Sequence, residues 1–278
     1  FMVYIVLDEI QNVNHWELFV NRLRRTKLVV VTGSNSKLLS GELATHLTGR
    51  YLDVRLFPFS FKEYLLKNGF QQSKAYTSKE KAEITKHLQE YMHVGGFPEV
   101  YKFGRAIIIR IYEDILVKDI LLRYQINKSE DLKKLAQYLI TNTAQEVTYN
   151  KLANVIGVKR ISTISNWISY LEQAFLLTKV ERFDFKLKQQ FKAPKKFYPA
   201  DPGLFHSIAF QFSSNIGRLM ENVVAIELQR RKKTIYYWKD HQQHEVDFII
   251  KEGGKITELI QVTYALNKSD VKDRELLG

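Results

Sequence analysis

The stretch YIVLDEIQNV, residues 4–13, decides the fold class of this chain. It opens with strand-forming apolar residues and then places two carboxylates, Asp8 and Glu9, side by side. A second near-continuous apolar run, KLVVVTGSNS, occupies residues 27–36, and the segment between the two runs repeats apolar residues at helical spacing. Such runs are typical of central parallel strands that helices cover on both faces. The order strand, helix, strand therefore predicts a βαβ unit and an α/β fold.

Polar side chains follow both predicted strands. Asp8 and Glu9 follow the first strand, and Thr32, Ser34 and Asn35 follow the second. In open α/β sheets, functional groups gather just beyond the carboxyl ends of the strands. In P-loop nucleotide hydrolases an Asp at this place holds Mg²⁺, an adjacent Glu polarises the attacking water, and a neighbouring polar residue senses the γ-phosphate. A simpler alternative stays open, in which the two acids only cap the helix that follows.

Residues 47–70, LTGRYLDVRLFPFSFKEYLLKNGF, carry the next strong local signal. Ser60 and Glu63 have the spacing of a capping box, in which each side chain satisfies a backbone N–H of the other. Gly69 has the position of a helix stop. The pattern predicts a short helix between these residues.

The stretches LDEIQNV, VTGSNSKLLSGELATHLTGR and FPFSFKEYL, in this order and spacing, resemble the bacterial and archaeal AAA-type ATPases that carry a C-terminal domain of unknown function of the 4143 type. The resemblance implies a P-loop NTPase module that uses ATP and Mg²⁺. It implies that Asp8 and Glu9 form the Walker B motif, with Asp8 at the metal ion and Glu9 catalytic. It also implies that Ser34, Asn35 and Arg50 lie near the nucleotide.

One departure from the family pattern concerns the phosphate-binding loop. The family places GxxxxGK[ST] ahead of the Walker B motif, and the 278 residues do not contain it, with only seven residues before Asp8. That loop supplies the backbone cradle and the lysine that hold the phosphates. We therefore expect residues 1–65 to be a partial nucleotide-binding core that binds ATP poorly on its own. Either the chain is a fragment of a longer protein, or the encoded protein has lost its front end.

Residues 66–135 are expected to form a helical lid or connector. Thr77 and Glu80 have the spacing of a second capping box, and the pair Gly95–Gly96 ends the helical pattern that follows. A second helix is predicted from the apolar run that begins at residue 107. The glycine pair needs no function beyond ending a helix.

Residues 136–200 have the pattern of a winged helix-turn-helix. A short helix stops at Gly157, a second helix follows, and the strand FLLTKVERF comes next. Residues 151–200 contain ten Lys and Arg but only three Asp and Glu, which gives this segment a net charge of +7. The whole chain carries a net charge of +12, so more than half of the excess lies here. This concentration of positive charge predicts contact with DNA phosphates and bases. The residues expected to make that contact are Lys159, Arg160, Thr163, Lys195 and Lys196. In the alternative, the winged helix packs against a protein partner.

Residues 201–278 are similar to the PD-(D/E)xK nuclease core. Their pattern predicts a helix that contains Glu221, a strand that contains Asp247 and a second strand, LIQVTYAL, that contains Gln261. The resemblance implies that these three residues hold Mg²⁺. Thr263 stands where the family has its lysine and supplies no positive charge, so we expect a nuclease-like fold used for binding or scaffolding. The chain ends where a helix begins, so this domain is expected to be truncated. Asp201 is expected to cap a helix.

Composition narrows the remaining choices. The chain contains no cysteine, no signal peptide and no apolar run near the length of about 20 residues that spans a membrane. We therefore expect a cytoplasmic protein without membrane contact, and a homo-oligomer is compatible with the sequence. The function predicted is that of an AAA-type ATP-binding and ATP-hydrolysing protein, of which this chain is a fragment, that acts on DNA. The alternative is a non-catalytic DNA-binding or scaffolding protein with a degenerate nuclease fold.

Overall fold

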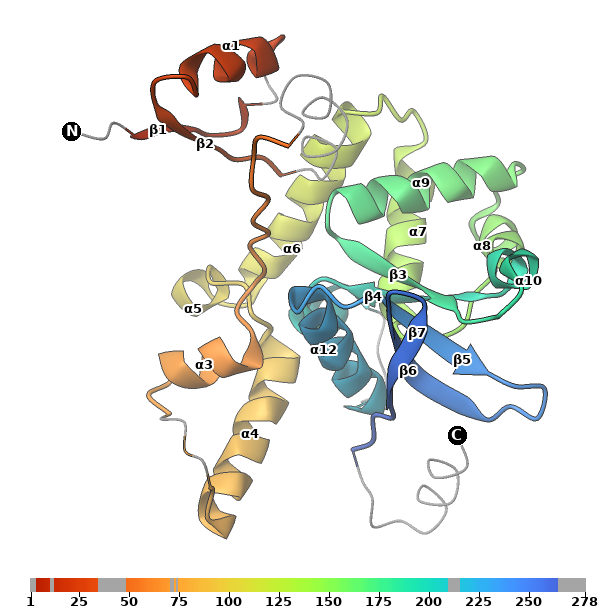
Figure 1. Cartoon of the computed structure of the whole chain (residues 1–278). Coiled ribbons are helices and arrows are strands. Elements are labelled where there is room, and N and C mark those ends of the chain that lie inside the picture. The colour runs from red at the N-terminus through yellow and green to blue at the C-terminus, as the bar shows by residue number, and fades with distance from the viewer. Residues whose placement is uncertain are drawn as a thin grey trace.

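The structure is a computed structural model of the chain, and Figure 1 shows how its elements are arranged. The residues that it describes are 4–10, 13–34, 49–70, 73, 75–209 and 216–264. Helices and strands are both present, as the α/β expectation requires, and a run of consecutive helices from α3 to α9 separates the strands of the two sheets.

The N-terminal unit contains β1 (Tyr4–Leu7), α1 (Trp16–Leu23) and β2 (Leu28–Val31). The two strands pair in parallel, which confirms the predicted strand, helix, strand order. Trp16 and Val20 of α1 are buried against one face of the strands.

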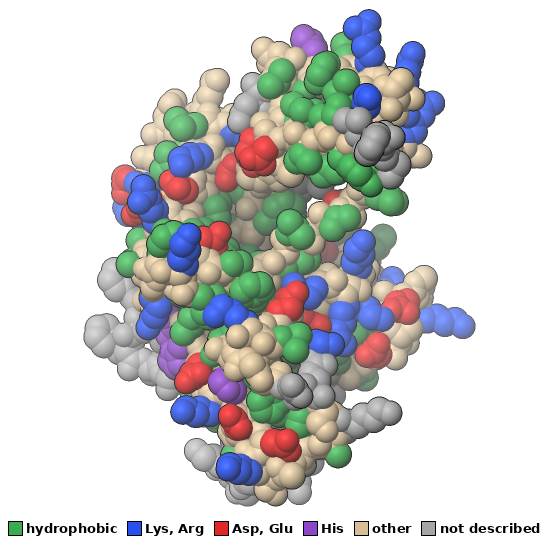
Figure 2. All heavy atoms as spheres, turned by 90° about the vertical axis from the view of Figure 1, so that its left-hand side faces the viewer, with side chains coloured by type: hydrophobic (Ala, Val, Ile, Leu, Met, Phe, Trp, Pro, Cys, Tyr) green, Lys and Arg blue, Asp and Glu red, His purple; other side chains and the backbone are tan. Residues whose placement is uncertain are grey.

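Among the residues that the structure describes, none is seen to cover the other face of this strand pair as predicted. Val6 and Val30 point away from α1 and are 65% and 45% exposed, respectively. Figure 2 shows hydrophobic side chains gathered on the surface of this uppermost lobe. In the described part of the chain, the predicted helical cover is therefore present on one face only.

A group of helices follows the N-terminal unit: α3 (Phe61–Lys67), α4 (Ser78–Val94), α5 (Val100–Phe103), α6 (Ala106–Asp114) and η3 (Ile115–Leu122). Both predicted capping boxes form, Ser60 with Glu63 and Thr77 with Glu80. The second predicted helix is present, but its last two turns, η3, are π-helical, which the sequence pattern does not reveal.

The next part contains α7 (Ser129–Thr141), α8 (Tyr149–Ile156), α9 (Ile161–Gln173), β3 (Leu177–Arg182), α10 (Leu187–Lys192) and β4 (Lys195–Pro199). β3 and β4 are an antiparallel pair, and a single bridge joins Val147 to Lys195 beside them. Gly157 ends α8 in a left-handed conformation, as predicted. The inward side chains of α9, among them Ile164 and Trp167, are buried in the largest core cluster.

The C-terminal elements are α11 (Pro202–Ile208), α12 (Ile216–Arg230), β5 (Ile235–Lys239), β6 (Glu245–Glu252) and β7 (Lys255–Ile260). They extend the β3–β4 pair into one five-stranded sheet of order β4-β3-β5-β6-β7. The boundary predicted at residue 200 therefore lies inside a continuous sheet. β7 also ends earlier than the predicted strand, so Gln261 and Thr263 follow it rather than lie within it.

Asp201 joins the helical group to the C-terminal part. It caps α11 as expected, with its Oδ1 accepting from Gly203 N at 2.8 Å, and its Oδ2 accepts from Gly96 N at 2.6 Å. Added Cβ atoms at Gly95 and Gly96 would lie 1.8 Å from Asp201 Oδ1 and 2.2 Å from Phe59 O, respectively. The glycine pair therefore does more than end α4, because it allows this close approach.

Candidate functional site

The carboxyl ends of β1 and β2 bring together the polar residues that the sequence singles out. Asp8 and Glu9 directly follow β1, and Thr32 and Ser34 follow β2. Thr32 Oγ1 donates a very short hydrogen bond to Asp8 Oδ1, and it accepts one from Glu9 N at 3.2 Å. Parallel pairing of the strands puts these groups at one edge, as expected for such a sheet.

Glu9 has an unusual backbone conformation for a residue with a side chain. Its φ is +47°, in the left-handed region. This region costs an L-residue other than glycine about 1–2 kcal/mol. The hydrogen bond to Thr32 holds the strained turn, and strain of this kind gathers at functional sites.

A third carboxylate, which sequence reasoning missed, reaches this site from η3. Ser34 Oγ donates to Asp119 Oδ1 at 2.5 Å and lies 3.5 Å from Glu9 Oε2. Arg123 Nη2 lies 3.5 Å from the same Asp119 oxygen. Asp119 stands in a mostly apolar helix far from Ser34 in the sequence, so no local pattern could have placed it here. The sequence offers only the presence of a charge in an apolar run.

The structure does not test the predicted roles of the other two residues near the nucleotide. Asn35 lies outside the described residues. Arg50 is exposed, and no described contact joins it to Asp8. The roles of both remain predictions.

The predicted metal residues Glu221 and Asp247 come together, but around a lysine, and Gln261 contacts the backbone of Asp247. Lys196 Nζ lies 2.9 Å from Glu221 Oε1 and 3.9 Å from Asp247 Oδ1. Gln261 Oε1 accepts from Asp247 N at 3.4 Å. Across the described residues, no group of three or more His, Cys, Asp or Glu side chains is arranged to hold a metal ion.

The expected DNA contacts divide into two groups. Lys159 and Arg160 are exposed at the start of α9, and Thr163 is half-buried one turn later. Lys195 and Lys196 are buried in β4, so the prediction that they contact DNA is wrong. Lys195 Nζ donates to the carbonyl oxygens of Gln190 and Phe191 at 2.7 and 3.2 Å, and the Lys196 ammonium lies among carboxylates.

The hairpin segment between β3 and β4 exposes a mixture of apolar and basic side chains. Phe185 is 88% exposed and Phe191 is 68% exposed. Lys186, Lys188 and Lys192 lie in the same segment, which includes α10, and are also exposed. Phe185 and Phe191 directly precede Lys186 and Lys192 in the sequence, and the structure shows that all four side chains are exposed.

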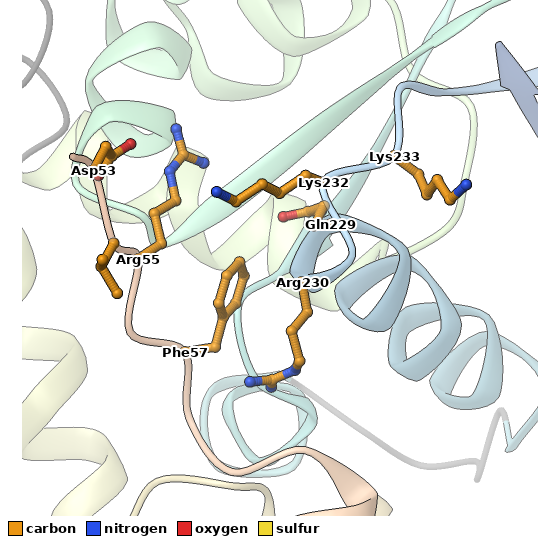
Figure 3. Close-up of a pocket in the computed structure, with 8 residues that line it drawn as sticks. Asp53, Arg55, Phe57, Gln229, Arg230, Lys232 and Lys233 are labelled. Atoms are coloured by element: carbon orange, nitrogen blue, oxygen red, sulfur yellow. The ribbon is translucent and has the colours of Figure 1, made fainter. Parts of the chain in front are cut away.

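A groove of about 490 Å³ lies between the segment 53–57 and the C-terminal end of α12. Figure 3 shows Lys232 extending across it toward Arg55, whereas Lys233 points away. Lys233 pairs with Glu252, and the Arg55 guanidinium lies 5.1 Å from the centre of the Phe175 ring. The groove is basic, but most of its cations already have partners inside the protein.

Comparison with protein families finds three matches along the chain. Residues 2–65 match the AAA domain, residues 85–215 match a domain of unknown function (DUF8612), and residues 216–277 match a domain of unknown function (DUF4143). No helix in the described part is both long and apolar enough to cross a membrane.

Similar proteins come from an archaeon and a bacterium. An uncharacterized protein of Methanocaldococcus jannaschii is 36% identical over 98% of this chain, which spans 63% of that protein's length. An uncharacterized protein of Haemophilus influenzae is 34% identical over 99% of this chain, which spans 69% of its length. A second uncharacterized Methanocaldococcus jannaschii protein is 24% identical, and the chain spans 57% of it.

Proposed function

We propose that this chain, which belongs to the family of AAA-domain proteins carrying the domain of unknown function DUF4143, supplies the metal-binding and water-activating carboxylates of an ATP-hydrolysing site. The observation that carries the proposal is the convergence of Asp8, Glu9, Thr32 and Ser34 at one edge of a parallel strand pair.

The donor set at this edge suits a magnesium ion. Asp8, Glu9, Thr32 and Ser34 offer only oxygen atoms, which Mg²⁺ prefers, and both acids are exposed. Thr32 engages Asp8 Oδ1, so Oδ2 is available as a ligand. Bound with ATP, the ion would neutralise charge on the phosphate oxygens.

Glu9 is proposed to orient and polarise the water that attacks the γ-phosphate. Its strained turn is tied to Thr32 through the backbone N–H, so the backbone from which the side chain projects is held in place. Ser34, held by Asp119, limits where the Glu9 carboxylate can lie. A positioned base of this kind contributes about 10²- to 10⁴-fold to a rate.

Substitution of Glu9 tests this role. In the protein that the gene encodes, with any residues ahead of Phe1 included, Glu9→Gln should lower the turnover of Mg·ATP at least about 100-fold, because an amide cannot act as a base. ATP binding should be retained. Glu83→Gln, an exposed change on α4, is the matched control and should hydrolyse ATP at the wild-type rate. Equal turnover in both variants would contradict the proposal.

We further propose that residues 136–200 form a winged helix-turn-helix that contacts DNA. The order α7, bridge, α8, α9, β3, α10, β4 supports this interpretation. In such domains the N-terminal end of the second helix meets the nucleic acid, and Lys159 and Arg160 are exposed there. The exposed lysines and phenylalanines of the β3–β4 hairpin add charge and stacking surface.

A salt titration tests the DNA proposal. The logarithm of DNA affinity should fall linearly with the logarithm of salt concentration, and Lys159→Ala and Arg160→Ala should each reduce the slope by about one if each contacts a phosphate. Lys79→Ala, at an exposed position of α4, should leave the slope unchanged. An affinity that does not depend on salt would exclude phosphate contact.

The C-terminal domain is proposed to have a nuclease-like fold without nuclease activity. Helix α12 with Glu221 and strand β6 with Asp247 occupy the expected order, but Gln261 replaces a carboxylate and Thr263 replaces a lysine. The alternative function of a non-catalytic DNA-binding or scaffolding protein therefore fits this domain better than metal-dependent cleavage.

A further inference from the structure

Three carboxylates of the C-terminal domain surround one buried ammonium group. Glu221 comes from α12, Glu245 and Asp247 come from β6, and Lys196 comes from β4. The side chain of Lys196 is 2% exposed. Its Nζ lies 2.9 Å from Glu221 Oε1, 3.9 Å from Asp247 Oδ1 and in very short contact with Glu245 Oε1.

Further hydrogen bonds hold the carboxylates in place. Tyr198 donates to Glu221 Oε1 at 2.6 Å, and the backbone N–H of Val262 donates to Asp247 Oδ2 at 2.8 Å. Glu245 also lies 3.5 Å from Lys239 Nζ, which itself pairs with Glu146 at 2.9 Å. Hydrogen bonds and ion pairs from several strands and one helix therefore fix the positions of the side chains in this cluster.

The charges of the cluster depend on one another. Burial alone lowers the pKa of Lys196, but the charges of Glu221 and Glu245 outweigh it, so that the pKa is raised overall. Burial, and then the charge of Glu221, raises the pKa of Asp247 to about 7. Burial raises the pKa of Glu221 and of Asp247, and the positive charge of Lys196 acts against this rise at both groups.

We propose that Lys196 is the resident cation of this centre and that it takes the place of a divalent metal ion. A hard divalent ion would need carboxylate oxygens at about 2.0–2.6 Å on several sides, and the ammonium stands between the oxygens that could supply them. The centre then binds no metal in the native protein, and β4 is fixed to α12 and β6 by charge.

The proposal explains why an amide and a hydroxyl are tolerated at Gln261 and Thr263. Three carboxylates already face one buried ammonium, so another carboxylate would add further buried negative charge, and another lysine would repel Lys196. The native chain would thus retain the carboxylates of a metal centre, with the Lys196 ammonium in the position of the metal ion.

Replacement of Lys196 by an uncharged side chain of similar length tests the proposal. Lys196→Met leaves buried carboxylates without their cation, so its melting temperature should fall. Mn²⁺ at millimolar concentration should then raise that temperature, and titration calorimetry should show Mn²⁺ binding at least tenfold tighter than in the wild type. Lys186→Met, in the exposed segment between β3 and β4, is the matched control. Its melting temperature and its Mn²⁺ affinity should equal those of the wild type.

Two further variants make the result decisive. Lys196→Met/Asp247→Asn should lose the gained Mn²⁺ binding, because it removes one carboxylate ligand. If Lys196→Met does not fold with or without Mn²⁺, Lys196→Met/Glu245→Gln removes one negative charge as well and serves in its place. A folded variant without Mn²⁺ binding would overturn the proposal. So would equally tight binding by the wild type, or wild-type cleavage of supercoiled DNA that Asp247→Ala abolishes.

Discussion

At the residue scale, contacts between residues close in the sequence could be predicted, whereas contacts between residues far apart in the sequence could not. The capping residues Ser60 and Thr77 act within one helical turn, so a spacing of three residues is enough to identify them. Asp119 and Lys196 acquire their partners only when distant segments pack together. A pair of lysines followed by aromatic residues gives no local sign that β4 is buried.

Gly96 is a residue at which packing forbids any side chain. A Cβ there would lie 2.2 Å from Phe59 O and 2.9 Å from Phe59 N, which are backbone atoms that cannot rotate away. Gly96→Ala should therefore lower the free energy of unfolding by about 1–3 kcal/mol. Gly254→Ala, where a Cβ meets nothing within 4 Å, should change it little. Denaturant unfolding measures both, and equal stability of the two variants would contradict the packing described.

Asp201 should make stability depend on pH. Burial raises the pKa of Asp201 from 3.8 to about 7, although the N–H groups of Gly96 and Gly203 oppose this. The folded state therefore binds the Asp201 proton more tightly than the unfolded state does. The stabilisation that this proton gives the folded state is fully present below about pH 4 and is lost as pH rises through 7.

Asp201→Asn separates this contribution from those of other acids. The variant should be less stable than the wild type at pH 5, because its amide NH₂ cannot accept from a backbone N–H. The difference in unfolding free energy between wild type and variant should shrink from pH 5 to pH 8. A difference that stays constant over this range would mean that Asp201 does not titrate there.

At the scale of elements, periodic segments were predicted more reliably than their ends. The helix predicted after Gly157 and the helix predicted around Glu221 are present as α9 and α12. β7 ends before Gln261, and η3 departs from α-helical geometry, because tertiary contacts rather than local propensity decide both. The π-helical turns matter for the candidate site, since they carry Asp119 to Ser34.

At the scale of the whole molecule, the segment that follows the N-terminal unit is tied to the end of α12 through side chains. Arg230 at the end of α12 donates to Pro58 O at 2.7 Å, and its guanidinium lies 4.9 Å from the centre of the Phe57 ring. The segment that leaves the N-terminal unit therefore rests on the C-terminal domain. The α/β class and the family could be predicted from motifs, whereas the continuous sheet across residue 200 could not. Action on DNA, a cytoplasmic location and assembly into a homo-oligomer remain predictions.

The central claim is that Asp8 and its neighbours hold the magnesium ion of an ATP site. Its most direct test is calorimetric titration of ATP into the protein that the gene encodes, with and without Mg²⁺. Wild type should bind ATP at least tenfold more tightly with Mg²⁺, and Asp8→Asn should lose that difference, because an amide is a weaker ligand than a carboxylate. An Asp8→Asn variant that keeps the full Mg²⁺ dependence would contradict the claim.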